Sequence, residues 1–253
     1  MNKFWFLIKN WFIAMGSPPS FYKWATTFLP WLGILAFLTF SLGLVWGIGF
    51  APSDYKQGDV YRILFIHVPS AILGQSIYLM MAVFGFISLV WRAKIAGMLL
   101  ISAAPLGAGF TLVALVTGSI WGKPTWGTWW VWDARLTSML VLFFFYLGYI
   151  ILSNAFERKI DGSKSASVLA IIGLINLPII KFSVDWWHTL HQPSSILKFD
   201  GPSIDEQMLL PLILMFFGFS IFSLYLIILN VKTKLIEKKC EALILKSNLK
   251  EFV

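Results

Sequence analysis

Long apolar stretches separated by short polar segments dominate the pattern along this chain. Six of these stretches reach the roughly 20 residues that an α-helix needs to cross the hydrocarbon core of a bilayer. Pro178 and Lys181 interrupt the fifth stretch near its end. The pattern predicts an all-α integral membrane protein, a bundle of six transmembrane helices forming a single domain over residues 1–253, with approximate spans 25–49, 63–91, 96–120, 136–156, 167–184 and 208–230.

The two ends of the chain follow different patterns. Residues 1–16 are apolar but contain Lys9 and lack a small-residue cleavage site, which favours an interfacial amphipathic helix over a signal peptide. Residues 232–253 mix lysine and glutamate with leucine and isoleucine. We expect this tail to form a cytoplasmic amphipathic helix on the membrane surface.

The composition agrees with a membrane protein. Only 13% of the residues are charged and 58% are hydrophobic, whereas about a quarter of the residues in a soluble domain are charged. Cys240 is the only cysteine, and no C-x-x-C-H run is present. The chain therefore has no disulfide framework, no thiolate metal cluster and no covalently attached c-type haem of its own.

The basic residues predict the orientation in the membrane. If the N-terminus is cytoplasmic, six spans return the C-terminus to the cytoplasm. Cytoplasmic segments then hold most of the basic residues, as is usual for membrane proteins: Lys3, Lys9, Lys23, Arg92, Lys94, Arg158, Lys159, Lys164, Lys232, Lys234, Lys238, Lys239, Lys246 and Lys250. The outer segments hold Lys56, Arg62, Lys123, Arg135, Lys181 and Lys198. This distribution explains the net charge of +8 without a nucleic-acid partner.

A tryptophan-rich segment, residues 121–135, connects the third and fourth spans on the predicted outer side. Aromatic belts at membrane surfaces are common, but they usually contribute one or two aromatic residues per span end. Glycines at 122 and 127 would let the backbone approach a planar ligand closely. We interpret the segment as a platform for a flat, apolar ligand with anionic groups, which haem fits best. Its platform residues are Trp121, Trp126, Trp129, Trp130, Trp132 and Asp133.

The three histidines, His67, His188 and His191, all fall on the same predicted outer side. A single histidine among apolar residues is usually a packing residue. Here two outer segments can each offer one imidazole, and two imidazoles on opposite faces of a haem iron are a common axial arrangement. The residues alone leave open whether the loop ligand is His188 or His191.

Haem propionates require cationic partners, and the planar guanidinium group suits a carboxylate best. Arg62 precedes His67, and Arg135 follows the tryptophans. Lys123 is a third candidate. The alternative is that these side chains extend to lipid headgroups and only anchor the helices.

The segment Trp126–Asp133 resembles the "WWD" signature of haem-handling membrane proteins in cytochrome c biogenesis. Further similarities extend over nearly the whole chain and indicate the CcmC family: Gly49–Pro52, Asp54–Tyr55, Tyr61–Ile63, His67–Pro69, Ala114–Ser119, Asn176–Ile180 and Trp186–Gln192. The similarity is weakest in the first dozen residues and in 194–207.

The resemblance implies that His67 and His191 are the axial ligands of a transiently and non-covalently bound haem b. It also implies haem delivery to the chaperone CcmE, together with the ATP-binding-cassette subunits CcmA and CcmB and the small protein CcmD. The expected location is a bacterial inner membrane, with the haem site facing the periplasm, or a mitochondrial inner membrane with the same machinery. Members of the family commonly carry asparagine at the position of His188, which we therefore interpret as a polar loop residue.

Two other functions remain open at this stage. A haem transporter would place polar or ionisable groups along a path at mid-membrane, but the predicted spans are almost purely apolar. A structural subunit would use the aromatic segment only to dock a partner. Whether the chain counts as an enzyme is also open, because the covalent linkage of haem to the chaperone requires no nucleophile from this chain.

Overall fold

The computed structural model describes residues 16–156, 159–191 and 204–251. Within these ranges the chain is helical, with α2 (Pro18–Leu44), the π-helical turn η1 (Val45–Phe50), the 3₁₀-helix η2 (Asp59–Ile63), α3 (Leu64–Trp91), α4 (Lys94–Trp126), α5 (Ala134–Asn154), α6 (Lys159–Ile172), the 3₁₀-turn η3 (Gly173–Ile175), α7 (Asn176–Trp186) and α8 (Glu206–Glu251). The expected N-terminal amphipathic helix falls mainly on residues 1–15, outside the described ranges.

Six of the described helical segments are long and apolar enough to cross a membrane: Pro18–Phe50, Asp59–Trp91, Lys94–Trp126, Ala134–Asn154, Gly162–Trp186 and Glu206–Ser247. This confirms the predicted all-helical class with six candidate spans. The first helix begins earlier than the expected residue 25, because Pro18 and Pro19 lie in its first turn, where a missing backbone N–H leaves no helical bond unmade.

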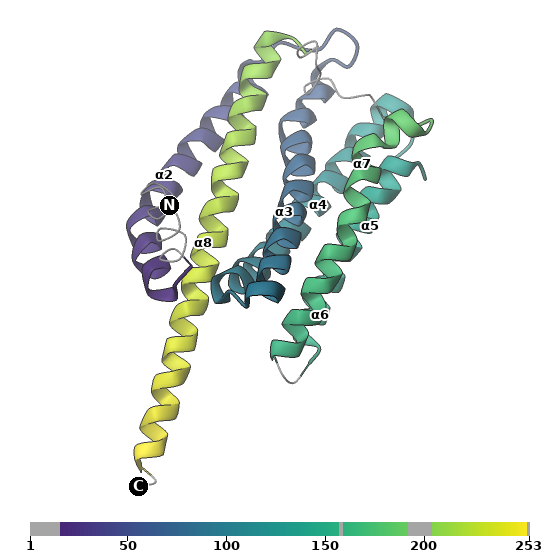
Figure 1. Cartoon of the computed structure of the whole chain (residues 1–253). Helices are drawn as coiled ribbons and strands as arrows, with labels where there is room; N and C mark the ends of the chain where they lie inside the picture. The colour runs from purple at the N-terminus through teal and green to yellow at the C-terminus, as the bar shows by residue number, and fades with distance from the viewer. Residues whose placement is uncertain (1–15, 157–158, 192–203, 252–253) are drawn as a thin grey trace, which may run out of the picture.

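The chain crosses the bundle alternately, so the connections gather at two ends (Figure 1). The tryptophan end, which is the upper end in Figure 1, holds the connection from α4 to α5 and the beginnings of α3 and α8. The opposite end, here called the basic end, holds Arg92, Lys94 and the last turns of α8 with Lys234 and Lys238. The beginning of α2 also lies at the basic end.

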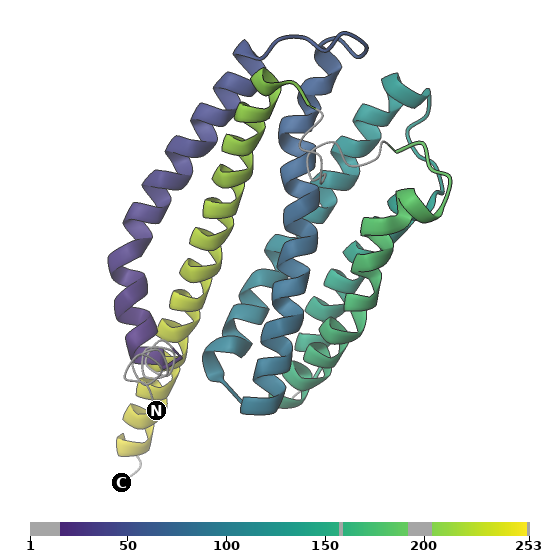
Figure 2. The same cartoon turned by 45° about the horizontal axis from the view of Figure 1, so that its top comes forward.

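The helices form two packed groups (Figure 2). One group consists of α2 and α8, which pack along each other. The other group consists of α3 to α7, in which α3 packs on α4, and α5 packs on α6 and α7. The main core contains the fully buried rings of Phe65, Tyr78 and Tyr146. Tyr146 crosses the bundle and donates a hydrogen bond of 2.6 Å from its hydroxyl to the carbonyl oxygen of Gly74. This contact ties α5 to α3 below the tryptophan end.

The fifth span changes its helical geometry where the sequence is irregular. Pro178 has no N–H to donate to the carbonyl of Leu174, and the 3₁₀-turn η3 lies at that point, between α6 and α7. Asn176 donates 2.8 Å from its side-chain amide to the carbonyl oxygen of Ser138 on α5. The irregular turn is therefore held against the neighbouring helix.

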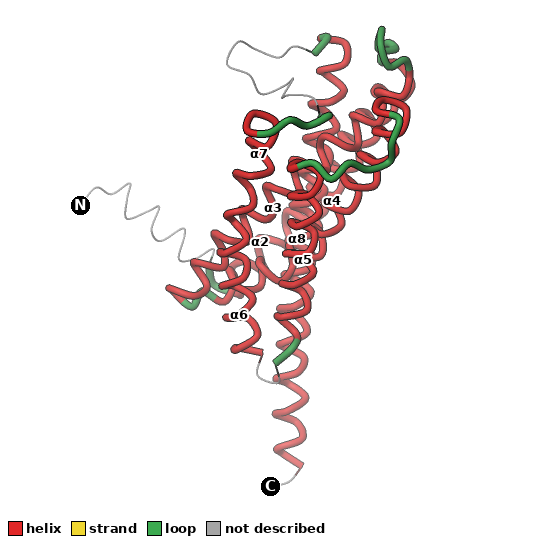
Figure 3. Tube along the Cα trace, turned by 90° about the vertical axis from the view of Figure 1, so that its right-hand side faces the viewer, coloured by secondary structure: helices red, strands yellow, loops and turns green. Residues whose placement is uncertain are grey.

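The tail differs from the expectation of a separate surface helix. Residues 232–251 continue α8 without a break and extend past the other helices at the basic end (Figure 3). No glycine or proline lies between Pro211 and Glu251 except Gly218, so nothing in the last turns ends the helix. The tail is thus the extension of a span.

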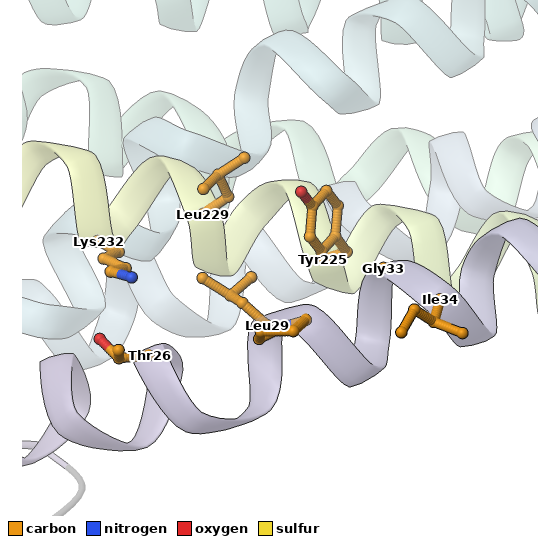
Figure 4. Close-up of a pocket in the computed structure, with 8 residues that line it drawn as sticks. Thr26, Leu29, Gly33, Ile34, Tyr225, Leu229 and Lys232 are labelled. Carbon is orange, nitrogen blue, oxygen red and sulfur yellow. The ribbon is translucent and has the colours of Figure 1, made fainter.

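Two shallow grooves lie between helices, away from the tryptophan segment. One, of about 400 Å³, lies between α2 and α8, with Leu29, Gly33 and Tyr225 on its walls and Lys232 at its basic end (Figure 4). The other, of about 540 Å³, is lined by residues of α3, η3 and α7, including Gln75 and Lys181. Neither groove includes a candidate haem-binding residue.

Candidate functional site

The end of α4 shapes the tryptophan segment. The helix continues to Trp126, past the expected end at residue 120, so Trp121 and Trp126 are helical and only 127–133 is an irregular connection. Gly127 ends the helix with a φ of +79°, and its N–H donates 3.0 Å to the carbonyl oxygen of Lys123. A left-handed residue after a helix is normally glycine, so the signal that ends α4 is Gly127.

Asp133 marks the beginning of the next helix. Its Oδ1 accepts a hydrogen bond of 2.8 Å from the backbone N–H of Leu136, the usual role of an aspartate at a helix N-cap. The seven residues between the two helices are therefore held at both ends. Within them, Trp129 and Trp132 are 58% and 76% exposed, whereas the indole of Trp130 is half-buried.

His67 lies in the first turn of α3 and packs against α4. Its Nδ1 is 3.1 Å from the hydroxyl oxygen of Thr117. The ring of Trp121 meets the imidazole edge-on, with ring centroids 5.7 Å apart. Gly118 provides the space, because a Cβ at that position would lie 3.0 Å from Cε1 of His67. The imidazole is thus enclosed by one face of α4.

His191 follows the end of α7 and approaches the same region. Its ring centroid is 6.1 Å from that of Trp126. The charges of His191 and Arg135 both act on the imidazole of His67, so each of these two side chains lies within electrostatic range of it. His188, in contrast, is exposed. The structure therefore brings His67, His191, Arg135 and the end of α4 together.

Comparisons with known proteins show the family of the chain. The family model described as heme exporter protein C (CcmC) matches residues 11–246. The heme exporter protein C of Escherichia coli K12 is 50% identical over 215 residues, which cover 85% of this chain and 86% of that protein. The chain belongs to the CcmC family.

Two further relatives extend the range of organisms. The heme exporter protein C of Haemophilus influenzae is 45% identical over 229 residues, covering 90% of this chain and 93% of the relative. A ccmC-like mitochondrial protein of cytochrome c biosynthesis from Marchantia polymorpha is 49% identical over 188 residues, covering 74% and 79% of the two chains. The family therefore has bacterial and mitochondrial members.

The two arginines of this CcmC-family chain have different surroundings. Arg62 donates from Nη1 to the carbonyl oxygens of Gly47 and Ile48, at 3.0 and 2.9 Å, and from Nε to Asp59 at 3.0 Å. Of its donors, Nη2 alone has no partner among the described residues. Arg135 is half-buried, and the described residues give its guanidinium no hydrogen-bond partner, although the charges of Asp133 and Asp185 act on it.

Two polar atoms of the tryptophan segment are buried without a partner among the described residues, Nε1 of Trp130 and Oδ2 of Asp133. A buried N–H donor normally has a partner, so Trp130 has capacity for an acceptor such as a carboxylate. Together with the guanidinium of Arg135, it offers the kind of donor that a propionate requires. The donor set of this CcmC-family site therefore fits haem.

Lys123 makes local contacts. Its ammonium group donates 3.1 Å to the carbonyl oxygen of Gly127 and lies 5.9 Å from the centroid of the Trp129 ring. These contacts fold the lysine back over the end of α4. The ammonium group of Lys123 is therefore engaged by residues of the connection between α4 and α5.

Three residues of the site received no role from the sequence: Thr117 and Gly118 beside His67, and Gln57, whose side-chain oxygen accepts 2.7 Å from Nε1 of Trp121. Thr117 and Trp121 are four residues apart and so share one helical face. That spacing was visible once the helix was known to continue past residue 120. Gln57 lies in a loop and has no such signal.

Proposed function

We propose that this chain binds haem at the tryptophan end, with His67 and His191 as axial ligands, and delivers it to the haem chaperone CcmE for the maturation of c-type cytochromes. The bound form is haem b, held transiently and without a covalent bond. The observation that carries the proposal is the convergence of His67, His191 and Arg135 beside the tryptophans at the end of α4.

The proposed site divides the work between apolar and polar groups. The faces of Trp121, Trp126, Trp129, Trp130 and Trp132 cover the porphyrin, because large aromatic rings bury apolar area without losing much side-chain entropy. Arg135 and Trp130 engage one propionate, and Nη2 of Arg62 is available to the other. Asp133 holds the segment to α5 through its N-cap.

Non-covalent ligation suits delivery. Two imidazoles would hold the iron strongly enough for capture, and release would break only these two coordination bonds, because no covalent bond would join the porphyrin to this chain. The exposed Trp129 and Trp132 leave an edge of the platform open to an acceptor. Attachment to the acceptor then needs a nucleophile from the acceptor and none from this chain.

The membrane and its partners complete the proposal. The basic end is cytoplasmic, in agreement with its lysines and arginines, and the tryptophan end faces the periplasm of a bacterium or the corresponding side of a mitochondrial inner membrane. CcmA, CcmB and CcmD are the proposed partners in the membrane. The names of the relatives from E. coli and H. influenzae refer to haem export, which is consistent with haem as cargo.

Passage of haem through this chain alone has less support. The residues that are buried in the described part of the structure include serine, threonine, asparagine and tyrosine but no charged side chain. A path for a dianionic molecule would require charged or strongly polar groups inside the bundle. Delivery from the tryptophan end requires none.

Absorption spectra of the purified protein, expressed with ample haem, test the proposal. The wild type should show a low-spin six-coordinate spectrum. His67→Ala and His191→Ala should lose it, while His188→Ala, the matched control in the same loop as His191, should keep it. If His188→Ala lost the spectrum and His191→Ala kept it, haem binding would stand but the assigned loop ligand would be wrong. A wild type without a Soret band would favour a docking subunit instead.

A further inference from the structure

The hydroxyl of Thr117 has one proton to donate. Its two nearest polar neighbours are the carbonyl oxygen of Val113 in the preceding helical turn, at 2.6 Å, and Nδ1 of His67, at 3.1 Å. A carbonyl oxygen can only accept, so at 2.6 Å the hydroxyl proton lies between Thr117 and Val113. Toward His67, the hydroxyl oxygen must then be the acceptor, and Nδ1 must carry the proton.

We propose that Thr117 is a positioning residue that holds His67 as the tautomer with its proton on Nδ1, which leaves the lone pair of Nε2 available for the haem iron. A neutral imidazole has one N–H and one bare nitrogen, and the hydrogen bond at the first decides which nitrogen is the ligand. The tautomer follows from the hydrogen bonds alone, while its role toward iron rests on the function proposed above.

A second carbonyl supports the same assignment. The carbonyl oxygen of Ala114, three residues before Thr117, lies 3.3 Å from the Thr117 hydroxyl oxygen. Like the carbonyl oxygen of Val113, it can only accept a proton. Both backbone neighbours of the hydroxyl therefore favour a hydroxyl proton that points away from His67.

The backbone of α4 positions these groups as a unit. Ala114, Thr117, Gly118 and Trp121 follow the spacing i, i+3, i+4, i+7, which places them on one helical face. Thr117 contacts Nδ1 of His67, Gly118 leaves space for Cε1, and the ring of Trp121 packs edge-on against the imidazole. The hydrogen bond from Trp121 to Gln57 anchors this last contact. The imidazole orientation is thus set before any ligand binds.

The choice of acceptor matters for the chemistry. Groups that accept from the second nitrogen of a ligating histidine raise its basicity, and a carboxylate does so more than a neutral oxygen. A hydroxyl therefore orients His67 while leaving it a moderate donor to iron. That balance suits a site that must release its haem.

The tautomer is measurable without haem. Nitrogen-15 spectra of the apo-protein labelled at histidine, in detergent or lipid discs, distinguish a protonated from a bare ring nitrogen, and His67→Gln assigns the His67 signals by their loss. The wild type should show a protonated Nδ1 and a bare Nε2. Thr117→Val should shift His67 toward a mixture of tautomers, and Thr117→Ser should restore the wild-type pattern. A bare Nδ1 in the wild type would overturn the proposal.

Haem binding supplies the second measurement. Thr117→Val should weaken haem binding about tenfold, the lower end of the range for such outer partners, and should raise the haem reduction potential, because the imidazole becomes a poorer donor. Thr117→Ser should restore both values. Thr125→Val is the matched control, since the Thr125 hydroxyl makes the same type of bond to the helix, at 2.7 Å to the carbonyl of Trp121, without touching an imidazole.

The two measurements separate the two proposals. If the wild type shows the expected tautomer but binds no haem, the haem function fails and the positioning role of Thr117 toward iron fails with it, while the hydrogen-bond assignment stands. If haem binds normally and Thr117→Val changes neither the tautomer nor the potential, the haem function stands and the positioning role is overturned.

Discussion

The two proposed axial histidines differ in how they are held. His67 lies within a regular helix, with a hydrogen bond to Thr117, an edge contact with Trp121 and a space left by Gly118. His191 lies beyond the end of α7, where its backbone N–H donates 3.1 Å to the hydroxyl of Thr189 and its ring meets Trp126. One ligand is built into the bundle, and the other is carried by an irregular segment.

The difference suggests separate tasks for the two ligands. A side chain on a rigid element can be positioned before the ligand arrives, whereas a side chain on a loop can adjust to it and withdraw. His67 would then define where the iron sits, and His191 would close the site on capture and open it on release. Substitutions at the two histidines and at their neighbours should therefore affect haem ligation by His67 and by His191 unequally.

The largest expected effect comes from replacing each histidine with glycine and adding free imidazole. His67→Gly leaves a space enclosed by α4 that imidazole can fill, so millimolar imidazole should restore the six-coordinate spectrum. His191→Gly leaves a space beside Trp126 on a segment that no regular helix holds in place, so rescue should be weaker. Absorption titrations with imidazole measure both. Equal rescue of the two variants would contradict the assignment of a built-in and a mobile ligand.

Removal of the guanidinium groups should give the next largest effect. Arg135→Gln should weaken haem binding about tenfold or more, since a hydrogen bond to a charged group contributes roughly 1.5–3 kcal/mol. Arg62→Gln should mainly lower the thermal stability, because it removes the bonds to Gly47 and Ile48. Haem titration and a melting curve of the apo-protein separate the effects. A larger loss of haem affinity in the Arg62 variant would reverse the roles.

Gly118→Ala tests the space beside His67. The added Cβ would lie 3.0 Å from Cε1, so the imidazole must move by a few tenths of an ångström. We expect haem binding to weaken about fivefold, less than the loss of an orienting partner. Gly109→Ala on the same helix is the control, because its Cβ would meet nothing within 4 Å. The expectation fails if both variants bind haem as the wild type does.

Thr189→Ala should have the smallest effect. It removes the two local hydrogen bonds between the Thr189 hydroxyl and the backbone of His191, and such a bond typically contributes about 0.5–1.5 kcal/mol. Haem should dissociate about threefold faster by stopped-flow transfer to apomyoglobin, with the spectrum unchanged. A changed spectrum would instead mean that Thr189 is required to place His191 as a ligand, and His191 would then be as firmly positioned as His67.

Much of the fold could be predicted because the bilayer imposes simple rules. A span needs a long apolar stretch, and six such stretches were visible along the chain. The ends of the helices were harder to predict. α4 continues past Trp121–Pro124 to Trp126, although Pro124 has no N–H to donate within the helix, and the left-handed Gly127 then caps its end.

The site was predictable in its residue types and less so in its supports. Histidine, tryptophan and arginine have chemistry that identifies them as candidates in an apolar chain. The roles of Thr117, Gly118 and Gln57 depend on which face of α4 packs against the beginning of α3 and the preceding loop. The pattern of apolar residues does not show this packing. Arg62 combines both cases, since its type suggests a propionate contact, while its structural bonds to the carbonyl oxygens of Gly47 and Ile48 depend on the fold.

One face of α4 carries the residues beside His67, namely Ala114, Thr117, Gly118 and Trp121. The site therefore depends on the angular position of each of these residues around the helix axis. A single inserted residue within 114–121 would rotate everything on one side of it by about 100° around the helix axis, since a turn contains 3.6 residues. The same insertion between Gly127 and Asp133 would leave the side chains of both flanking helices on their faces and would displace only the tryptophans of the connection. A change in chain length before Gly127 should therefore disturb His67 and its partners, and one after Gly127 should disturb the tryptophan platform alone.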